Sequence, residues 1–114
     1  MWLLLHQGEV LLEKRAVSGL WGGLWSLPET QDTDDACAHC RRQYGIEIGD
    51  IFSLPEYVHG FTHFRLHIFP KVAHVNSRTT SVEQGGMVWL SIEDAVGAAV
   101  PAPVRKILTQ LKTL

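Results

Sequence analysis

Four carboxylates that could hold a divalent metal lie around the start of one predicted helix, Asp34–Tyr44: Glu29, Asp32, Asp34 and Asp35. A metal ion that acts on pyrophosphate requires several carboxylates clustered on one helix face. These four lie instead in a loop or in the first helical turn, where the helix dipole and solvation explain them. The polar positions further along the helix are His39, Arg41, Arg42 and Gln43. Neither a metal site nor hydrolytic chemistry is therefore predicted, and no catalytic residue is assigned.

The loop before this helix is rich in glycine and tryptophan, and residues 19–25 read Gly-Leu-Trp-Gly-Gly-Leu-Trp. Two adjacent glycines indicate unusual backbone angles or a close backbone approach. Trp21 and Trp25 have two interpretations. Either indole packs in the core, or it stacks on a base or lines a nucleotide cleft, where stacking contributes about 1–3 kcal/mol per base.

A second candidate site is the short stretch Phe61-Thr62-His63, which follows Gly60 and lies between two β-rich runs. An aromatic ring, a hydroxyl and an imidazole at a turn are typical of recognition loops. The alternative interpretation is a plain hairpin turn whose Phe61 packs inward.

Charge and cysteine content limit the classes of partner. The formal net charge of −2 does not attract a polyanion, and the basic residues form small groups: Lys14-Arg15, Arg41-Arg42, Arg65 with Lys71, and Arg105-Lys106. If DNA is the partner, most of the phosphate affinity must come from elsewhere. The two cysteines, Cys37 and Cys40, are too few for a zinc site and badly spaced for a disulfide, so we expect small buried apolar residues in a reducing cytosol.

The predicted elements define an α+β sandwich with a mixed sheet in one domain, residues 1–114. Strands are predicted at Trp2–His6, Val10–Arg15, Trp25–Leu27, Ile51–His59, Phe64–Val75 and Met87–Leu90, with Phe64, Leu66 and Ile68 inward. The first helix is expected to be capped by Asp32 or Thr33 and stopped by Gly45. A short helix follows a capping box at Ser91, and the last helix, Val104–Leu111, buries Val104, Ile107, Leu108 and Leu111.

The apolar run at the start of the chain, residues 1–5, is too short for a signal peptide or a membrane span. A chain that opens inside a strand is expected to be a piece of a longer protein.

Taken together, these motifs resemble the C-terminal domain of the bacterial MutY family of adenine DNA glycosylases. The resemblance covers essentially the whole chain. It rests on residues 10–15 and 18–25, on Pro28, on the turn at 61–64 and on residues 102–104, which lead into the last helix. That domain is similar to the Nudix fold of MutT-type hydrolases, so the resemblance implies a Nudix-like α/β/α sandwich.

The Nudix signature helix carries metal-binding glutamates, and this chain lacks them. When the end of the signature motif is aligned with Gly45-Ile46, the preceding motif positions are occupied by Ala38, His39, Cys40, Arg41, Arg42 and Gln43. The resemblance therefore implies a Nudix-like fold with a degenerate Nudix helix and no hydrolysis. A nucleotide-pool hydrolase with an atypical metal site, or a protein-interaction module, stay as alternatives.

In the MutY family this domain recognises 8-oxoguanine opposite the adenine to be removed. The resemblance implies that the lesion and the DNA are bound by Phe61, Thr62, His63, Trp21, Gly22 and Arg65. Thr62 stands where the family has serine and keeps the hydroxyl. The implied partners are duplex DNA containing 8-oxoguanine:adenine and an upstream glycosylase domain carrying the catalytic residues and a 4Fe–4S cluster, which two cysteines cannot supply here. A monomeric bacterial cytoplasmic protein, with no cofactor in this part and no membrane partner, is expected.

Overall fold

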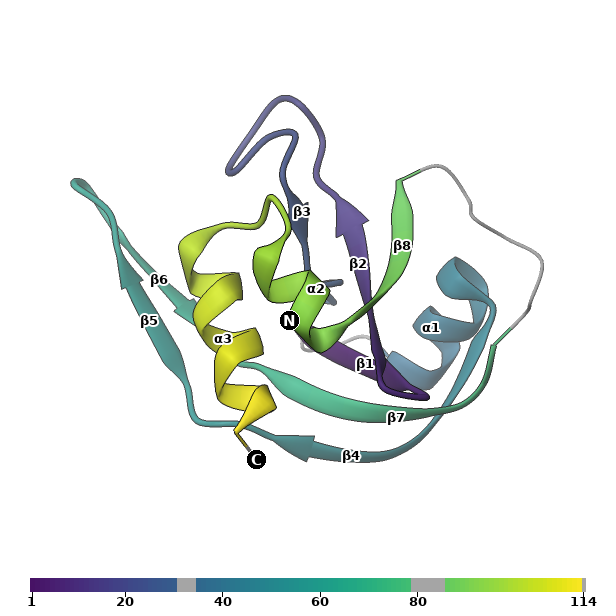
Figure 1. The fold of residues 1–114 in the computed structure, drawn as a ribbon. Helices are drawn as coiled ribbons and strands as arrows, with labels where there is room; N and C mark the ends of the chain where they lie inside the picture. Colours follow the sequence, from purple (N-terminus) through teal and green to yellow (C-terminus); the bar gives the residue numbers. More distant parts are fainter. Residues whose placement is uncertain (31–34, 79–85, 114) are drawn as a thin grey trace.

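The computed structural model describes residues 1–30, 35–78 and 86–113. Three strands precede the first helix, five strands follow it, and two helices end the chain, which is an α+β order (Figure 1). The strands are β1 (Trp2–His6), β2 (Glu9–Lys14), β3 (Trp25–Ser26), β4 (Ile46–Ser53), β5 (Tyr57–Gly60), β6 (Arg65–Ile68), β7 (Lys71–Arg78) and β8 (Met87–Ser91). The helices are α1 (Ala36–Tyr44), α2 (Ile92–Gly97) and α3 (Ala102–Lys112).

The main sheet is mixed, with the order β3-β2-β1-β7-β4, and β8 pairs with β2. β1 and β7 run parallel, whereas the other pairs of this sheet are antiparallel. β1 and β2, both predicted as strands, are joined by a tight hairpin in which Gln7 and Gly8 have positive φ, as a two-residue turn requires. β5 and β6 form a separate antiparallel hairpin.

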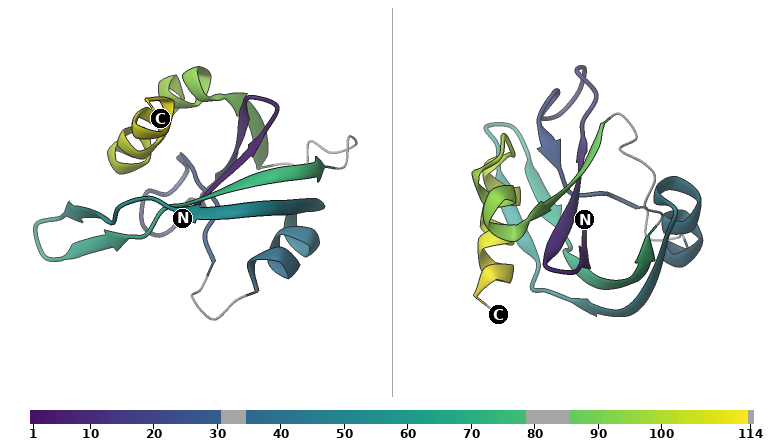
Figure 2. Two further views of the ribbon diagram at one scale, coloured as in Figure 1. Left: turned by 90° about the horizontal axis from the view of Figure 1, so that it is seen from below. Right: turned by 45° about the vertical axis from the view of Figure 1, so that its right-hand side comes forward.

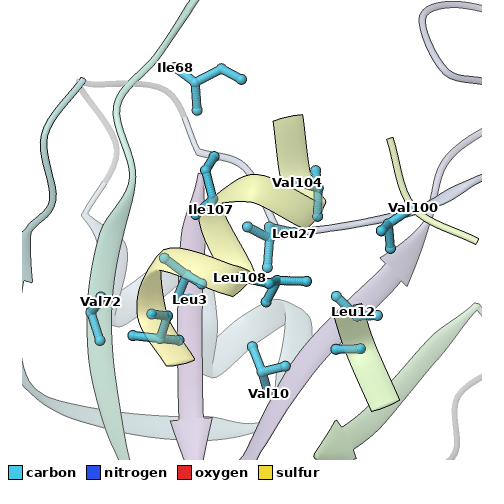
Figure 3. Close-up of a cluster of buried hydrophobic side chains, with 12 residues drawn as sticks. Leu3, Val10, Leu12, Leu27, Ile68, Val72, Val100, Val104, Ile107 and Leu108 are labelled. Carbon is cyan, nitrogen blue, oxygen red and sulfur yellow. The ribbon is translucent and has the colours of Figure 1, made fainter. Parts of the chain in front are cut away.

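Helices cover both faces of the main sheet, with α1 on one side and α2 and α3 on the other (Figure 2). The face under α2 and α3 holds the larger core, to which β1, β2 and β7 contribute (Figure 3). The face under α1 holds a smaller core that includes Trp2, Leu4 and Cys40. The α/β/α sandwich predicted from the sequence is confirmed.

The last helix follows its sequence pattern closely. Pro103 lies in the first turn, where a proline costs no hydrogen bond. The four predicted apolar residues, Val104, Ile107, Leu108 and Leu111, are all buried. Ser91 is the predicted N-cap of α2, and its Oγ accepts from the Asp94 N–H at 3.1 Å.

The start of α1 differs from the prediction. The helix begins at Ala36, because the Asp35 carboxylate caps it by accepting from the N–H groups of Cys37 and Ala38. The predicted caps Asp32 and Thr33 lie outside the described residues. Gly45 ends the helix as predicted, in the left-handed region at φ 64°.

Only one of the two cysteines is buried, which corrects the expectation for Cys37. Cys40 lies in the smaller core, whereas Cys37 is exposed. Three residues turn a helix by about 300°, so the two side chains diverge by about 60°. A nine-residue helix that buries Cys40 alone leaves Cys37 in solvent.

Two long predicted strands are each broken by a proline. The run at 51–59 is β4 and β5, with Leu54, Pro55 and Glu56 between them, and β4 already begins at Ile46. The run at 64–75 is β6 and β7, separated by Phe69 and Pro70. The second of these strands was predicted to end at Val75, but β7 continues to Arg78, and residues 79–85 lie outside the described part.

Candidate functional site

The β5–β6 hairpin extends away from the main sheet (Figures 1 and 2). Its four residue pairs run from Tyr57 opposite Ile68 to Gly60 opposite Arg65. Tyr57 and Ile68 pack against the larger core at the base of the hairpin. The far end is therefore held outward by a two-stranded ribbon whose base is buried.

The turn of this hairpin is the predicted Phe61-Thr62-His63 stretch. The Phe61 N–H donates to the Phe64 carbonyl at 2.7 Å and closes the turn. Thr62 and His63 are exposed, and Phe61 is half-buried. In the described part of the chain the N–H groups of Thr62 and His63 have no acceptor, so both can donate to a ligand. Phe61 thus packs inward against Trp21 and His59, as the plain-hairpin interpretation expects, whereas the next two residues face solvent.

Phe64 does not point inward as predicted. Its side chain is 52% exposed. The strand register begins only at Arg65, so the alternation of β6 does not reach Phe64. Its ring instead stacks on Phe61, with centroids 4.5 Å apart and an interplanar angle of 20°.

Phe61 is the centre of an aromatic cluster that joins the hairpin to the glycine-rich loop. The His59 ring meets Phe61 edge-on at 4.7 Å. The Trp21 indole lies 5.9 Å from Phe61 and 6.2 Å from His59. The fold thus brings together two of the stretches that the sequence singled out. His59 was not predicted as a site residue, although its place two residues before Phe61 puts both on one face of an extended chain.

The loop that carries Trp21 is tightly folded around Arg15. The Arg15 guanidinium donates to the Leu20 carbonyl at 2.8 Å and to Glu29 at 2.9 Å, and it lies 5.9 Å from the Trp21 ring. Trp21 itself adopts φ 54°, a left-handed conformation that is uncommon for a residue with a Cβ. Gly22 follows, and a Cβ on it would lie 2.0 Å from the Val17 carbonyl oxygen. The close backbone approach predicted for the paired glycines is therefore at Gly22.

Trp25 is separate from this cluster. It belongs to β3, its N–H donates to the Ala99 carbonyl at 2.9 Å, and its ring packs against the larger core. Core packing is thus the role of Trp25, whereas Trp21 touches both the core and the hairpin.

Arg65 is exposed on the opposite face of the hairpin from His59. It pairs with Gly60 in the ladder, on the face shared by Val58 and His67. His67 is held by Glu56 at 2.5 Å, whereas Arg65 has no ion-pair partner within the described ranges. Arg65 is therefore a cation available to an anionic ligand beside the turn.

The carboxylates near α1 that the structure describes already have partners, whereas Asp32 and Asp34 lie outside the described residues. Glu29 pairs with Arg15, and Asp35 caps the helix. Glu13 accepts from the Tyr44 hydroxyl at 3.0 Å. Burial raises the pKa of the Tyr44 phenol, and the adjacent Glu13 raises it further. Across residues 1–30, 35–78 and 86–113, no group of three or more His, Cys, Asp or Glu side chains could hold a metal ion.

The outer surface of α1 is basic. Arg41 donates from Nε and Nη2 to Glu47 at 2.7 and 2.9 Å, which lowers the pKa of the Glu47 carboxyl. Arg42 and Gln43 are exposed beside it.

Among the described residues, neither of two surface cavities is lined by the turn residues. One, of about 370 Å³, lies beside the start of α1 and includes Trp2, Thr30 and Lys71. The other, of about 400 Å³, lies between the glycine-rich loop and β3 and includes Lys14, Ser18 and Ser26. Neither is lined by Trp21 or Trp25. The candidate site that the sequence singled out is the projecting turn, with its exposed polar groups.

The fold and the site define a Nudix-type sandwich whose signature helix has lost the residues for metal binding. The chain belongs to the NUDIX domain family, which it matches over residues 1–110. It is also similar over 110 residues, at 26% identity, to the adenine DNA glycosylase of Buchnera aphidicola subsp. Baizongia pistaciae. That match covers 96% of this chain and 31% of the relative. The glycosylase of Buchnera aphidicola subsp. Acyrthosiphon pisum is 23% identical over 111 residues, again 96% of this chain and 31% of the relative. The chain thus spans about a third of the length of these relatives.

Solved structures share the fold. The C-terminal domain of mouse MUTYH, solved in complex with human PCNA, superimposes with a TM-score of 0.73 at 21% identity, covering 98% of this chain and 84% of that one. A MutT NUDIX hydrolase from Burkholderia pseudomallei superimposes with a TM-score of 0.65 at 18% identity, and the match covers 96% of this chain and 92% of the hydrolase chain. The resemblance inferred from the motifs is confirmed. No described helix is long and apolar enough to cross a membrane.

Proposed function

We propose that this chain is the lesion-recognition domain of an adenine DNA glycosylase, which reads 8-oxoguanine opposite the mispaired adenine. The observation that supports it most is the exposed turn at the end of a projecting hairpin, which presents a hydroxyl at Thr62 and two N–H groups that have no acceptor among the described residues. The similarity to adenine DNA glycosylases over nearly the whole chain agrees with it.

The chemistry of the lesion matches the polar groups of the turn. Oxidation converts guanine N7 from an acceptor into an N–H donor and adds a carbonyl at C8. The Thr62 Oγ accepts from that N–H, and the amides of Thr62 and His63 donate to O8. The Phe61 N–H is already used by Phe64 in closing the turn, so it is not among the donors. The Phe61 ring packs beside the base.

Discrimination against undamaged guanine depends on more than the hydroxyl. A hydroxyl also donates, so by rotating it could satisfy the unmodified N7. An amide aimed at O8 has no such freedom, and an undamaged guanine leaves it unpaired, which costs about 1–3 kcal/mol when the donor is buried in the complex. The turn amides are therefore expected to carry more of the specificity than Thr62.

Binding of the isolated chain to DNA is expected to be weak. The net charge is −2, and Arg65 and His63 are the basic groups at the turn. Each phosphate contact contributes through released counterions, so two such contacts give a small salt dependence. Most of the phosphate affinity is assigned to the rest of the longer protein.

The same proposal places catalysis outside this chain. The relatives are about three times as long, and the N-glycosidic cleavage belongs to their remaining part. A 4Fe–4S cluster requires four ligands, and the residues present do not fit it, since Cys37 and Cys40 are two cysteines with one buried. We propose that this chain is one domain and not an enzyme by itself, and that it acts with the upstream glycosylase domain as a monomer in the bacterial cytoplasm.

The test is the excision of adenine by the complete glycosylase with Phe61→Ala and Thr62→Ala introduced together. The preference for 8-oxoguanine:adenine over guanine:adenine is expected to fall, because both the hydroxyl and the packed ring are lost. Thr109→Ala is the matched control, since Thr109 is an exposed threonine on α3 whose hydroxyl bonds the Arg105 carbonyl. An unchanged preference in the double variant contradicts the proposal.

The hydrolase alternative has its own measurement. The chain is incubated with 8-oxo-dGTP and magnesium, and no turnover is expected because the helix carries no metal-binding carboxylates. Turnover above the uncatalysed rate would establish the alternative. Titration of the isolated chain with lesion duplex separates the protein-interaction module from the lesion-recognition domain only if binding is seen, because weak binding is expected in either case.

A further inference from the structure

We propose that Trp21 is a positioning residue, which holds the recognition turn in place through Phe61 and does not itself touch DNA. This inference rests on the proposed function of the turn. It changes the role expected for Trp21 and Gly22 from DNA contact to support of the hairpin.

The first argument is the contact between the two segments. Trp21 and Phe61 are far apart in the sequence, yet their rings lie 5.9 Å apart, tilted by 40°. Trp21 also meets His59, which stands on the same strand face. The base of the hairpin is anchored by Tyr57 and Ile68 in the core. At the far end, Trp21 provides the contact with the body of the protein.

The second argument is the conformation of the loop. A residue with a Cβ adopts φ 54° only where the surroundings impose it, and Trp21 does so. On one side of Trp21, the Arg15 Nε–H donates a hydrogen bond to the carbonyl of Leu20. On the other side Gly22 packs against the Val17 backbone with no room for a side chain. These constraints fix the direction of the indole, which points at the hairpin.

The third argument is the exposure of the residues concerned. Trp21 and Phe61 are both half-buried, and each covers part of the other, whereas Thr62 and His63 are exposed. The Phe61 ring, the His59 ring and the Arg15 guanidinium all lie within 6.2 Å of the Trp21 ring, which leaves less of its surface for a base. Contact with the ligand is thus left to the turn.

The consequence concerns specificity more than affinity. A hydrogen bond that distinguishes N7–H and O8 from plain guanine needs a donor and an acceptor at fixed places. A mobile turn would still reach the duplex, but its amides would no longer meet O8 at a set distance. Loss of Trp21 is therefore expected to lower the ratio of affinities for damaged and undamaged duplex and to leave the affinity for undamaged duplex unchanged.

The first measurement needs no DNA. Hydrogen exchange of the Phe61 amide, which bonds the Phe64 carbonyl, reports the opening of the turn. In Trp21→Leu this exchange is expected to become about threefold to tenfold faster, as the loss of one aromatic contact implies. Trp21→Phe is expected to restore part of the protection. Trp25→Leu is the matched control, because it removes an indole that packs on the same core without touching Phe61. Equal protection in Trp21→Leu and the wild type overturns the proposal.

The second measurement is a titration of the same variants with duplexes containing 8-oxoguanine:adenine or guanine:adenine, followed by NMR. For Trp21→Leu the ratio of the two affinities is expected to fall about fivefold, the value of one hydrogen bond. Equal weakening on both duplexes would make Trp21 a DNA contact and overturn the proposal. If the wild type shows no preference, the proposed function fails, and the exchange of the Phe61 amide alone decides whether Trp21 positions the turn.

Discussion

Replacing Gly22 by alanine tests the tight folding of the glycine-rich loop. The added Cβ would lie 2.0 Å from the Val17 oxygen, 2.7 Å from its carbonyl carbon and 3.0 Å from the Ala16 oxygen. All three neighbours are backbone atoms, so no flexible side chain can move aside. Ordinary contact begins at 3.4 Å, and the backbone must therefore separate by about 1.4 Å.

A shift of this size breaks the hydrogen bonds that close the loop. The Gly23 N–H donates to the Arg15 carbonyl and the Leu24 N–H to the Trp21 carbonyl, both at 3.2 Å. Each such bond contributes about 0.5–1.5 kcal/mol, so Gly22→Ala is expected to lower the free energy of unfolding by about 2 kcal/mol. For a domain of this size that corresponds to a fall in Tm of roughly 8 °C.

The neighbouring glycine provides the control. Gly23 has φ 79°, and a Cβ added to it would meet nothing within 4 Å, so Gly23→Ala adds backbone strain without a clash. Its cost is expected to be about 1 kcal/mol, less than that of Gly22→Ala. Urea unfolding of both variants, followed by tryptophan fluorescence, measures the difference. A Gly22→Ala variant as stable as the wild type, or more stable than Gly23→Ala, would refute the close approach.

Other regions of the molecule give further expectations. The pKa of Tyr44 is raised in the folded state, so the stability that this residue contributes is present below pH 10 and is lost as the pH rises above it. Tyr44→Phe loses the hydrogen bond to Glu13, so its free energy of unfolding at pH 7 is expected to fall by about 1 kcal/mol. Urea unfolding across pH is expected to show a shallower alkaline decline in this variant than in the wild type. Leu108→Ala leaves a cavity at a fully buried site in the larger core, so the free energy of unfolding is expected to fall by about 2–5 kcal/mol. Thermal unfolding measures this change, and a fall of less than about 1 kcal/mol would contradict the packing of α3. Burial raises the pKa of the Cys40 thiol to about 11, so brief alkylation at pH 8 is expected to modify Cys37 alone. Mass spectrometry identifies the labelled cysteine, and label on Cys40 in the folded protein would contradict its burial.

Local sequence signals predicted the parts of the fold that local interactions determine. The spacing of Val104, Ile107 and Leu108 predicted a buried helix face, and Gly45 predicted a helix end, because both depend on a few neighbouring residues. The β1–β2 hairpin follows from the backbone freedom of Gly8. The same kind of signal located the turn at residues 61–63.

Contacts between distant segments could not be read in this way. Nothing in the sequence near Trp21 indicates that it meets Phe61, because that contact depends on how the hairpin folds back towards the loop. Phe64 was predicted inward since alternation alone does not show where a strand begins. The pairing of Arg15 with Glu29 was missed for the same reason, although it removes a carboxylate that the sequence left available.

The separation of the β5–β6 turn from both cores has a consequence for how its specificity can change. Residues 62 and 63 contribute no side chain to either core, so their identity has little effect on whether the protein folds. Substitutions there are limited by what the turn must bind and hardly by stability. The tip is therefore a favourable place for directed evolution, in which variants that recognise a different damaged base could be selected on an unchanged scaffold.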